Sequence, residues 1–341
     1  MIGFNINKEV EKMYFGKMDF IKKTSQAFFG TVTGRTVDGI TLDDAYDGFK
    51  RNRYIDFVKN ENINYIWSQD NDMDLLSFFP DIEYLTIPGG AENLKSVQKL
   101  RKLKGIELSY NCFSEIDFND FSEIESLVIH GQINDTNKLA KIKTLKHLYC
   151  SQWELKSLET LSVLTNLETL VLDFCKNLID LNGLSKLKNI NRFRIIYCKK
   201  LTNISEIKNV GKSLKILDII DCAQIDNLSY IQNLKNLVSL SILTTNAKKI
   251  NSFESLKFIN DLNNLEEFTT DYKIKDNDLS PLLRLQDAVI LNYSKKYNIR
   301  DKDLPKKFVN VRTSEYTSEM KLLTEVEGGK ENPNIIWYDE I

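Results

Sequence analysis

The chain has 341 residues, of which 42% are hydrophobic and 28% charged, so it can build a sizeable core and a well-solvated surface. Its formal net charge of −2 argues against a nucleic-acid-binding protein that depends on phosphate contacts. The start of the chain lacks the basic and apolar pattern of a signal peptide, and no stretch is apolar enough to cross a bilayer. We therefore expect a cytoplasmic protein without membrane contact.

Residues 1–60 do not follow the pattern of the rest of the chain and are expected to form an N-terminal cap. Phe28 to Val37 suggests a hairpin or turn, and its glycines superficially resemble a phosphate-binding loop, but Arg35 stands where lysine is required. Thr41 is a plausible N-cap, and the apolar spacing after it predicts a helix up to Asn60.

Asp70, Asp72 and Asp74 resemble the start of a calcium-binding loop. Leu75 stands in place of the required glycine, and Asp81 in place of the final glutamate. The favoured interpretation is a solvated loop that opens a short helix at residues 73–79.

A repeating stretch runs from Ile82 to about Tyr293, with the signature L-x-x-L-x-L at intervals of 20 to 28 residues. The clearest copy is 167–172. The middle aliphatic position of the ten copies is held by Leu85, Ile106, Leu127, Leu148, Leu170, Phe193, Leu217, Leu240, Phe268 and Ala288. Self-similarity at this period predicts a solenoid, in which each repeat buries its apolar side against its neighbours.

Each copy is expected to contain a short strand, because its aliphatic residues alternate with variable ones. Stacking the copies places the strands in a parallel sheet. Between strands, aliphatic residues recur every third position, as at Leu155, Leu158, Leu161 and Leu164, which fits short 3₁₀ turns better than long helices. The longer interval between Leu240 and Phe268 suggests an inserted helix.

The pattern L-x-x-L-x-L-x-x-[N/C], followed by aliphatic residues at every third position, resembles the leucine-rich-repeat family. It is most similar to the short-period branch of bacterial internalins and eukaryotic phosphatase regulators. The resemblance covers residues 61–298 and implies an α/β solenoid, a right-handed superhelix with a curved parallel sheet on its concave face, short helices on its convex face, and caps at 1–60 and 299–341. It says little about function, since family members mostly bind other proteins of diverse identity.

Three of the five cysteines, Cys175, Cys198 and Cys222, hold the same repeat position. The resemblance implies that Cys or Asn at this position turns inward and hydrogen-bonds the loop backbone, and Asn111 holds the equivalent place in an earlier copy. Neighbouring repeats would hold the thiols about 5 Å apart at Cα, within disulfide range. A stack of buried, reduced structural thiols is the plainer interpretation. Cys112 is expected to be partly exposed.

No catalytic or metal-binding constellation is predicted, and no cofactor. The two histidines, His130 and His147, lie about 13–14 Å apart on neighbouring predicted strands, too far to share a metal ion. No CxxC pair supports a zinc site. An enzyme with its activity in residues 1–80 or 299–341 and the repeats as substrate selector stays open as an alternative, although both flanks lack histidine and cysteine.

The variable strand positions point away from the core and are expected to form an exposed concave face. Ile196, Ile220 and Leu243 follow one another there, and an exposed apolar patch indicates an interface. The alternatives are coverage by the C-terminal segment folding back, or simple tolerance of these apolar residues at the surface. The charged positions beside the patch fit either a surface ion-pair ladder of small worth or an interface hot spot. The predicted partner-binding residues are Tyr149, Asp173, Arg192, Arg194, Ile196, Ile216, Asp218, Ile220 and Leu243.

The sequence therefore predicts a non-enzymatic protein-binding module, monomeric on its own, with a protein partner and no nucleic acid. A bacterial immunity protein or secreted effector, whose solenoid binds a toxin or a host target, is the alternative.

Overall fold

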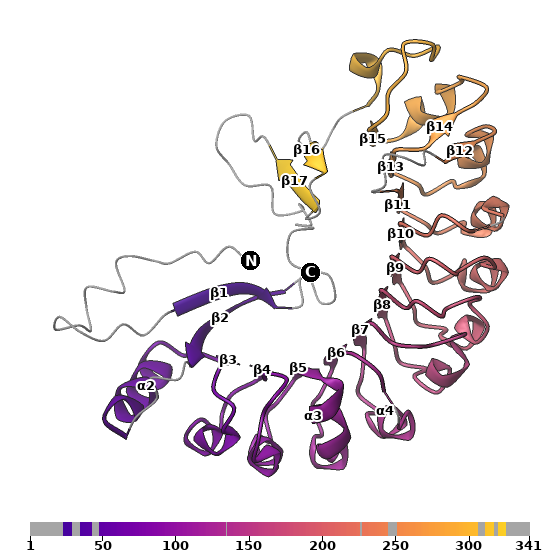
Figure 1. Ribbon diagram of the computed structural model, residues 1–341. Coiled ribbons are helices and arrows are strands. Elements are labelled where there is room, and N and C mark those ends of the chain that lie inside the picture. Colours follow the sequence, from indigo (N-terminus) through magenta and orange to yellow (C-terminus); the bar gives the residue numbers. More distant parts are fainter. Residues whose placement is uncertain are drawn as a thin grey trace. The chain divides into compact units, whose positions relative to one another are not determined.

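The computed structural model describes residues 23–28, 35–42, 48–133, 135–225, 227–244, 251–305, 311–316 and 320–324 (Figure 1). The chain forms two compact units, which divide in sequence between Tyr149 and Cys150. One strand, β7 (His147–Ser151), spans the division.

The first unit is built on a sheet whose strands follow one another in chain order. Its strands are β1 (Lys23–Phe28), β2 (Arg35–Leu42), β3 (Tyr65–Ser68), β4 (Tyr84–Thr86), β5 (Gly105–Ser109) and β6 (Ser126–His130). Pairing is antiparallel between β1 and β2 and parallel from β2 to β6. Between the strands lie helix α2 (Gly48–Asn60), the 3₁₀ turns η1 (Met73–Phe78), η2 (Leu94–Lys99) and η3 (Phe118–Asp120), and the short helices α3 (Tyr110–Glu115) and, after β6, α4 (Asn137–Lys141).

The second unit continues the same scheme. Its parallel strands are β8 (Thr169–Asp173), β9 (Arg192–Ile196), β10 (Ile216–Ile220), β11 (Ser239–Leu243), β13 (Glu267–Thr270) and β15 (Asp287–Ile290). The helical turns of this unit are 3₁₀: η4 (Glu159–Leu161) before β8, then η5 (Leu184–Lys186), η6 (Ser205–Val210), η7 (Ser229–Asn233), η8 (Lys257–Asp261) and η9 (Ser280–Arg284) between the strands, and η10 (Asp301–Asp303) after β15. This unit also contains two small two-stranded sheets. Strand β12 (Ser252–Phe253) pairs in parallel with β14 (Lys273–Ile274), and β16 (Val311–Tyr316) pairs antiparallel with β17 (Met320–Thr324).

The strand register confirms the predicted solenoid of leucine-rich repeats. Leu170 lies opposite Phe193, and Leu217 lies between Phe193 and Leu240. These are the middle positions of successive sequence repeats, and all four side chains are fully buried. A repeat of period near 20 thus places one aliphatic residue per strand on the same side of the sheet, where the side chains stack into one core.

Helix assignments differ from the sequence prediction at two places. Thr41 lies in β2, which pairs with β3, so it does not cap a helix; the described helix α2 spans Gly48–Asn60. The insertion before Phe268 forms the bridge-like strand β12 and the 3₁₀ turn η8 instead of an α-helix. In both places the backbone hydrogen bonds to neighbouring repeats decide against the local helical spacing. The predicted short helix after the aspartates is present as η1, and the carboxylates of Asp70 and Asp72 each accept a backbone N–H two residues on, at 2.9 and 3.0 Å.

The predicted thiol stack is present in the second unit. Cys175, Cys198 and Cys222 are buried and reduced. Each Sγ donates to the carbonyl two residues before it, at 3.7, 3.5 and 3.3 Å. The predicted Asn111 equivalence is wrong: Asn111 is exposed in α3, while Cys112 is 2% exposed and its Sγ lies 3.6 Å from the Pro88 carbonyl. Helix α3 begins directly after β5, which moves the inward position by one residue.

The thiols are expected to be inert in the native protein. A hydrogen bond with Cys198 and burial raise the pKa of the Cys175 thiol, and burial raises that of Cys150. Because the thiolate is the reactive species, a disulfide reagent such as DTNB should modify the folded protein only as fast as it unfolds. The same protein in guanidinium should release five equivalents at once. A rapidly reacting thiol in the folded protein would contradict this assignment.

Candidate functional site

The strand register brings most of the predicted partner-binding residues together on the outward face, the side of the second unit's sheet opposite the leucine core. Asp173, Ile196, Ile220 and Leu243 form one row across β8 to β11. Arg194 lies opposite Asp218, and Arg192 opposite Ile216. Tyr149 belongs to the first unit. The outward face of β8–β11 therefore carries eight of the nine predicted residues.

The predicted exposure of this face is wrong. Ile196, Ile220 and Leu243 are 2%, 0% and 6% exposed. Strand pairing alone does not bury outward positions, because Thr269, which has a strand on either side and lies in the same row as Arg194 and Asp218, is only half-buried. Other parts of the chain therefore lie over β8–β11. The C-terminal segment, which the sequence offered as a cover, falls mostly outside the described residues.

A buried ion pair stands at the centre of the outward face. The Arg194 Nε atom lies 2.9 Å from Asp218 Oδ2, and the two side chains are 0% and 3% exposed. This pair is not the weak surface ladder that the sequence left open. Removing two charges from water costs several kcal/mol per ion, so such a pair persists only where its geometry and surrounding hydrogen bonds compensate.

A chain of hydrogen bonds crosses the sheet of the first unit. The Tyr65 hydroxyl lies 3.1 Å from Thr86 Oγ1, which donates to Glu107 Oε2 at 3.0 Å. Glu107 Oε1 lies 3.0 Å from His130 Nε2, and the His130 ring packs edge-on against Tyr149 at 5.7 Å. This series of hydrogen bonds was not predicted from the sequence. Thr86 lies opposite Glu107, but the contacts of Tyr65 with Thr86 and of Glu107 with His130 run diagonally between strands, and Tyr65 belongs to a degenerate repeat.

The Glu107–His130 pair could hold and orient a proton, as carboxylate–imidazole pairs do in catalysis. Two hydroxyls beside the pair are already engaged: Thr86 donates to Glu107 Oε2 at 3.0 Å, and Ser109, which lies opposite His130, donates to Cys112 Sγ at 3.5 Å. Among the described residues no cluster of three or more His, Cys, Asp or Glu side chains could hold a metal ion. In the same part of the chain, no helix is long and apolar enough to span a bilayer.

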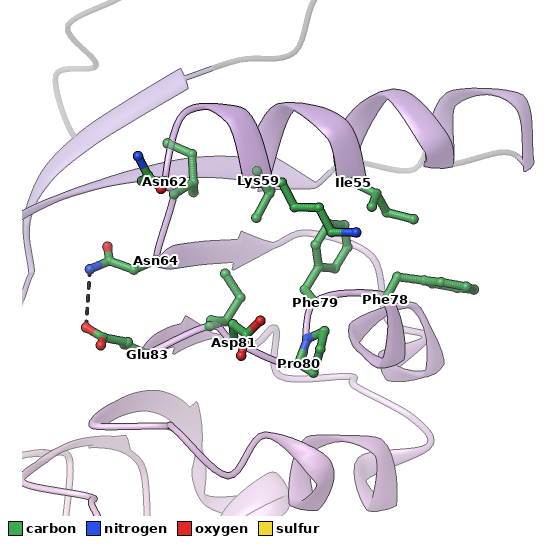
Figure 2. A pocket seen from close by; sticks show the side chains of 12 residues that line it. Ile55, Lys59, Asn62, Asn64, Phe78, Phe79, Pro80, Asp81 and Glu83 are labelled. Carbon is green, nitrogen blue, oxygen red and sulfur yellow. Dashed lines mark hydrogen bonds between the residues drawn. The ribbon is translucent and has the colours of Figure 1, made fainter.

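A cavity of about 420 Å³ opens beside the C-terminal half of α2 (Figure 2). Ile55 and Lys59 of α2 line one side of it, and residues 78–83 line the other. Its two carboxylates are already paired: Asp81 with Lys102 at 2.8 Å and Glu83 with Lys104 at 2.6 Å. Because both carboxylates are held by lysines, neither is free to fix a ligand's orientation in the cavity.

Comparisons with known proteins are limited to solved structures, since no family model and no curated protein matches the chain. Internalin C2 of Listeria monocytogenes is 22% identical, over 64% of this chain and 82% of its own, with a TM-score of 0.41. Internalin InlF of the same organism is 17% identical over 69% and 81%, with a TM-score of 0.38. The Arabidopsis receptor kinase HAESA ectodomain, solved with an IDA peptide hormone, is 16% identical over 67% and 42%, with a TM-score of 0.41.

Proposed function

We propose that this solenoid of leucine-rich repeats is a non-enzymatic protein-binding module, and that its partner contacts the outward face of β8–β11. The observation that carries the proposal is the buried Arg194–Asp218 pair. Apolar residues would stabilise a covered sheet face at least as well as an ion pair does. A guanidinium–carboxylate pair bordered by apolar Ile196 and Ile220 instead has the composition of an interface hot spot.

The proposed binding face comprises the eight predicted residues on β8–β11, whereas Tyr149 belongs to the first unit. Because the face is buried, the partner has to take the place of the chain that lies over it. Ile216 is the half-buried member of the set on β10, and Ser239 is its half-buried neighbour on β11. These two side chains mark where a partner first gains access to the face. A protein partner also suits the formal net charge of −2 better than a nucleic acid does.

Site-specific photo-crosslinking tests this proposal without disturbing the buried residues. A photoreactive phenylalanine analogue at Ile216 or Ser239 is expected to capture a partner protein from a lysate of the source cell. The matched control places the same analogue at Val163 or Ile179, which are 53% and 47% exposed in turns of the second unit. Capture only from the control positions, or from none of the four, would refute binding at the outward face.

A further inference from the structure

Four consecutive repeats place a non-glycine residue in the left-handed backbone region immediately after the strand. They are Gln152, Phe174, Tyr197 and Asp221, with φ of 59°, 50°, 52° and 54°. The N–H of each donates to the carbonyl of the last residue of the next strand, at 2.8 to 3.0 Å. The left-handed conformation is therefore a regular feature of these repeats. It lets each turn add one more backbone hydrogen bond to the parallel pairing of neighbouring strands. Glycine adopts this region without cost, whereas a bulky side chain there is strained by about 1–2 kcal/mol.

Two of the four residues are nonetheless aromatic. The rings of Phe174 and Tyr197 stack with centroids 4.4 Å apart and planes inclined by 22°. Phe174 is 39% exposed. Folding does not require an aromatic side chain here, because glycine or asparagine would satisfy the same turn. A large, strained and exposed side chain is the kind of feature that points to function. We call this stacked pair the aromatic ledge.

The position two residues after the left-handed residue is a lysine in the two repeats of the aromatic ledge and not in the other two. Lys176 and Lys199 each follow the aromatic residue by two positions, and Lys200 comes next; all three are exposed. Glu154 and Ala223 hold the equivalent place beside Gln152 and Asp221. Lys200 Nζ donates to Asn177 Oδ1 at 2.9 Å, and within the described ranges none of the three lysines forms an ion pair. A flat apolar surface thus has an unneutralised positive border.

We propose that the aromatic ledge and its lysines bind an acidic peptide segment carrying an aromatic or proline side chain. The segment's ring would pack on Phe174 and Tyr197, and its carboxylates would meet the ammonium groups of Lys176, Lys199 and Lys200. This site stands at the strand ends, outside the outward face, and does not depend on the function proposed above.

Selection from a phage-displayed library of random twelve-residue peptides, against the immobilised full chain, tests the proposal. Enriched peptides are expected to be acidic and to contain an aromatic residue or proline. The leading peptide, synthesised and labelled, is then titrated by fluorescence anisotropy. The double variant Phe174→Gly/Tyr197→Gly should weaken its binding by about tenfold or more, since aromatic anchors dominate such contacts. The melting temperature should not fall, because glycine suits the left-handed turn.

Two matched variants separate binding from folding. Gln152→Gly changes the same backbone position in an exposed, non-aromatic repeat and should leave affinity unchanged. Lys176→Glu/Lys199→Glu should weaken binding and its salt dependence, whereas Lys186→Glu/Lys188→Glu in and after η5 should do neither. Failure to enrich any peptide, enrichment of peptides without acidic residues, or unchanged affinity in the glycine double variant would each overturn the proposal.

Discussion

Replacing Asp218 by alanine is expected to lower the free energy of unfolding by about 3–5 kcal/mol. The Arg194 guanidinium is fully buried and its Nε atom lies 2.9 Å from the Asp218 carboxylate. Without that carboxylate, a positive charge in a low-dielectric position loses a counter-charge that lies 2.9 Å away. The loss of a desolvated ion-pair contact should far exceed what a surface pair contributes.

Urea denaturation followed by circular dichroism measures this effect. The Arg300–Asp303 pair supplies a matched control, because it joins the same residue types at 2.5 Å with both side chains well exposed. Asp303→Ala should change the stability little. The double variant Arg194→Met/Asp218→Leu, which removes both charges, should cost less than Asp218→Ala alone. Equal effects of Asp218→Ala and Asp303→Ala would show that the Arg194–Asp218 pair is solvated.

Placing aspartate at Ile220 is expected to destabilise the protein by roughly 3 kcal/mol or more, because an ionised carboxylate would enter a fully buried apolar position. Ile216→Asp offers a close comparison. Both isoleucines lie on β10 and point to the same face, but Ile216 is half-buried. The stability loss at Ile216 should therefore be clearly smaller.

Thermal and urea unfolding of the two variants at pH 7 checks this prediction, with Ile220→Val as the control for volume loss alone. If Ile220→Asp and Ile216→Asp lose the same small amount of stability, the centre of the outward face is accessible to water in solution. A loss confined to Ile220 would instead show that the cover over β8–β11 is part of the folded protein.

The solenoid could be predicted because every repeat has the same spacing of aliphatic residues. The aliphatic positions around Leu170, Leu217 and Leu240 have the same spacing, and stacking is the one arrangement that buries them all. The cysteine stack follows from the same spacing. Predictions failed where the repeat is irregular: Thr41 precedes the first regular copy, Asn111 lies where α3 replaces a turn, and η8 fills a longer insertion.

The candidate sites were predictable only in part. Alternation along a strand identified which side chains point away from the core, so Arg194, Asp218 and Ile220 were correctly placed on one face. The polar chain from Tyr65 to His130 joins residues diagonally across strands, and single-strand alternation does not reveal such contacts. The left-handed turns at Phe174 and Tyr197 were equally hidden, because neither residue type favours that conformation.

By itself, the sequence determined the architecture of this protein, the residues of its core and the face on which each strand residue lies. These properties follow from the short-range periodicity of aliphatic residues, which recurs in every repeat. Only long-range packing buries the centre of the outward face and makes Arg194 and Asp218 a desolvated pair. It also stacks two aromatic residues, both in left-handed turns, beside exposed lysines. Burial and stacking depend on which segments far apart in the chain come together, and no local pattern carries that information.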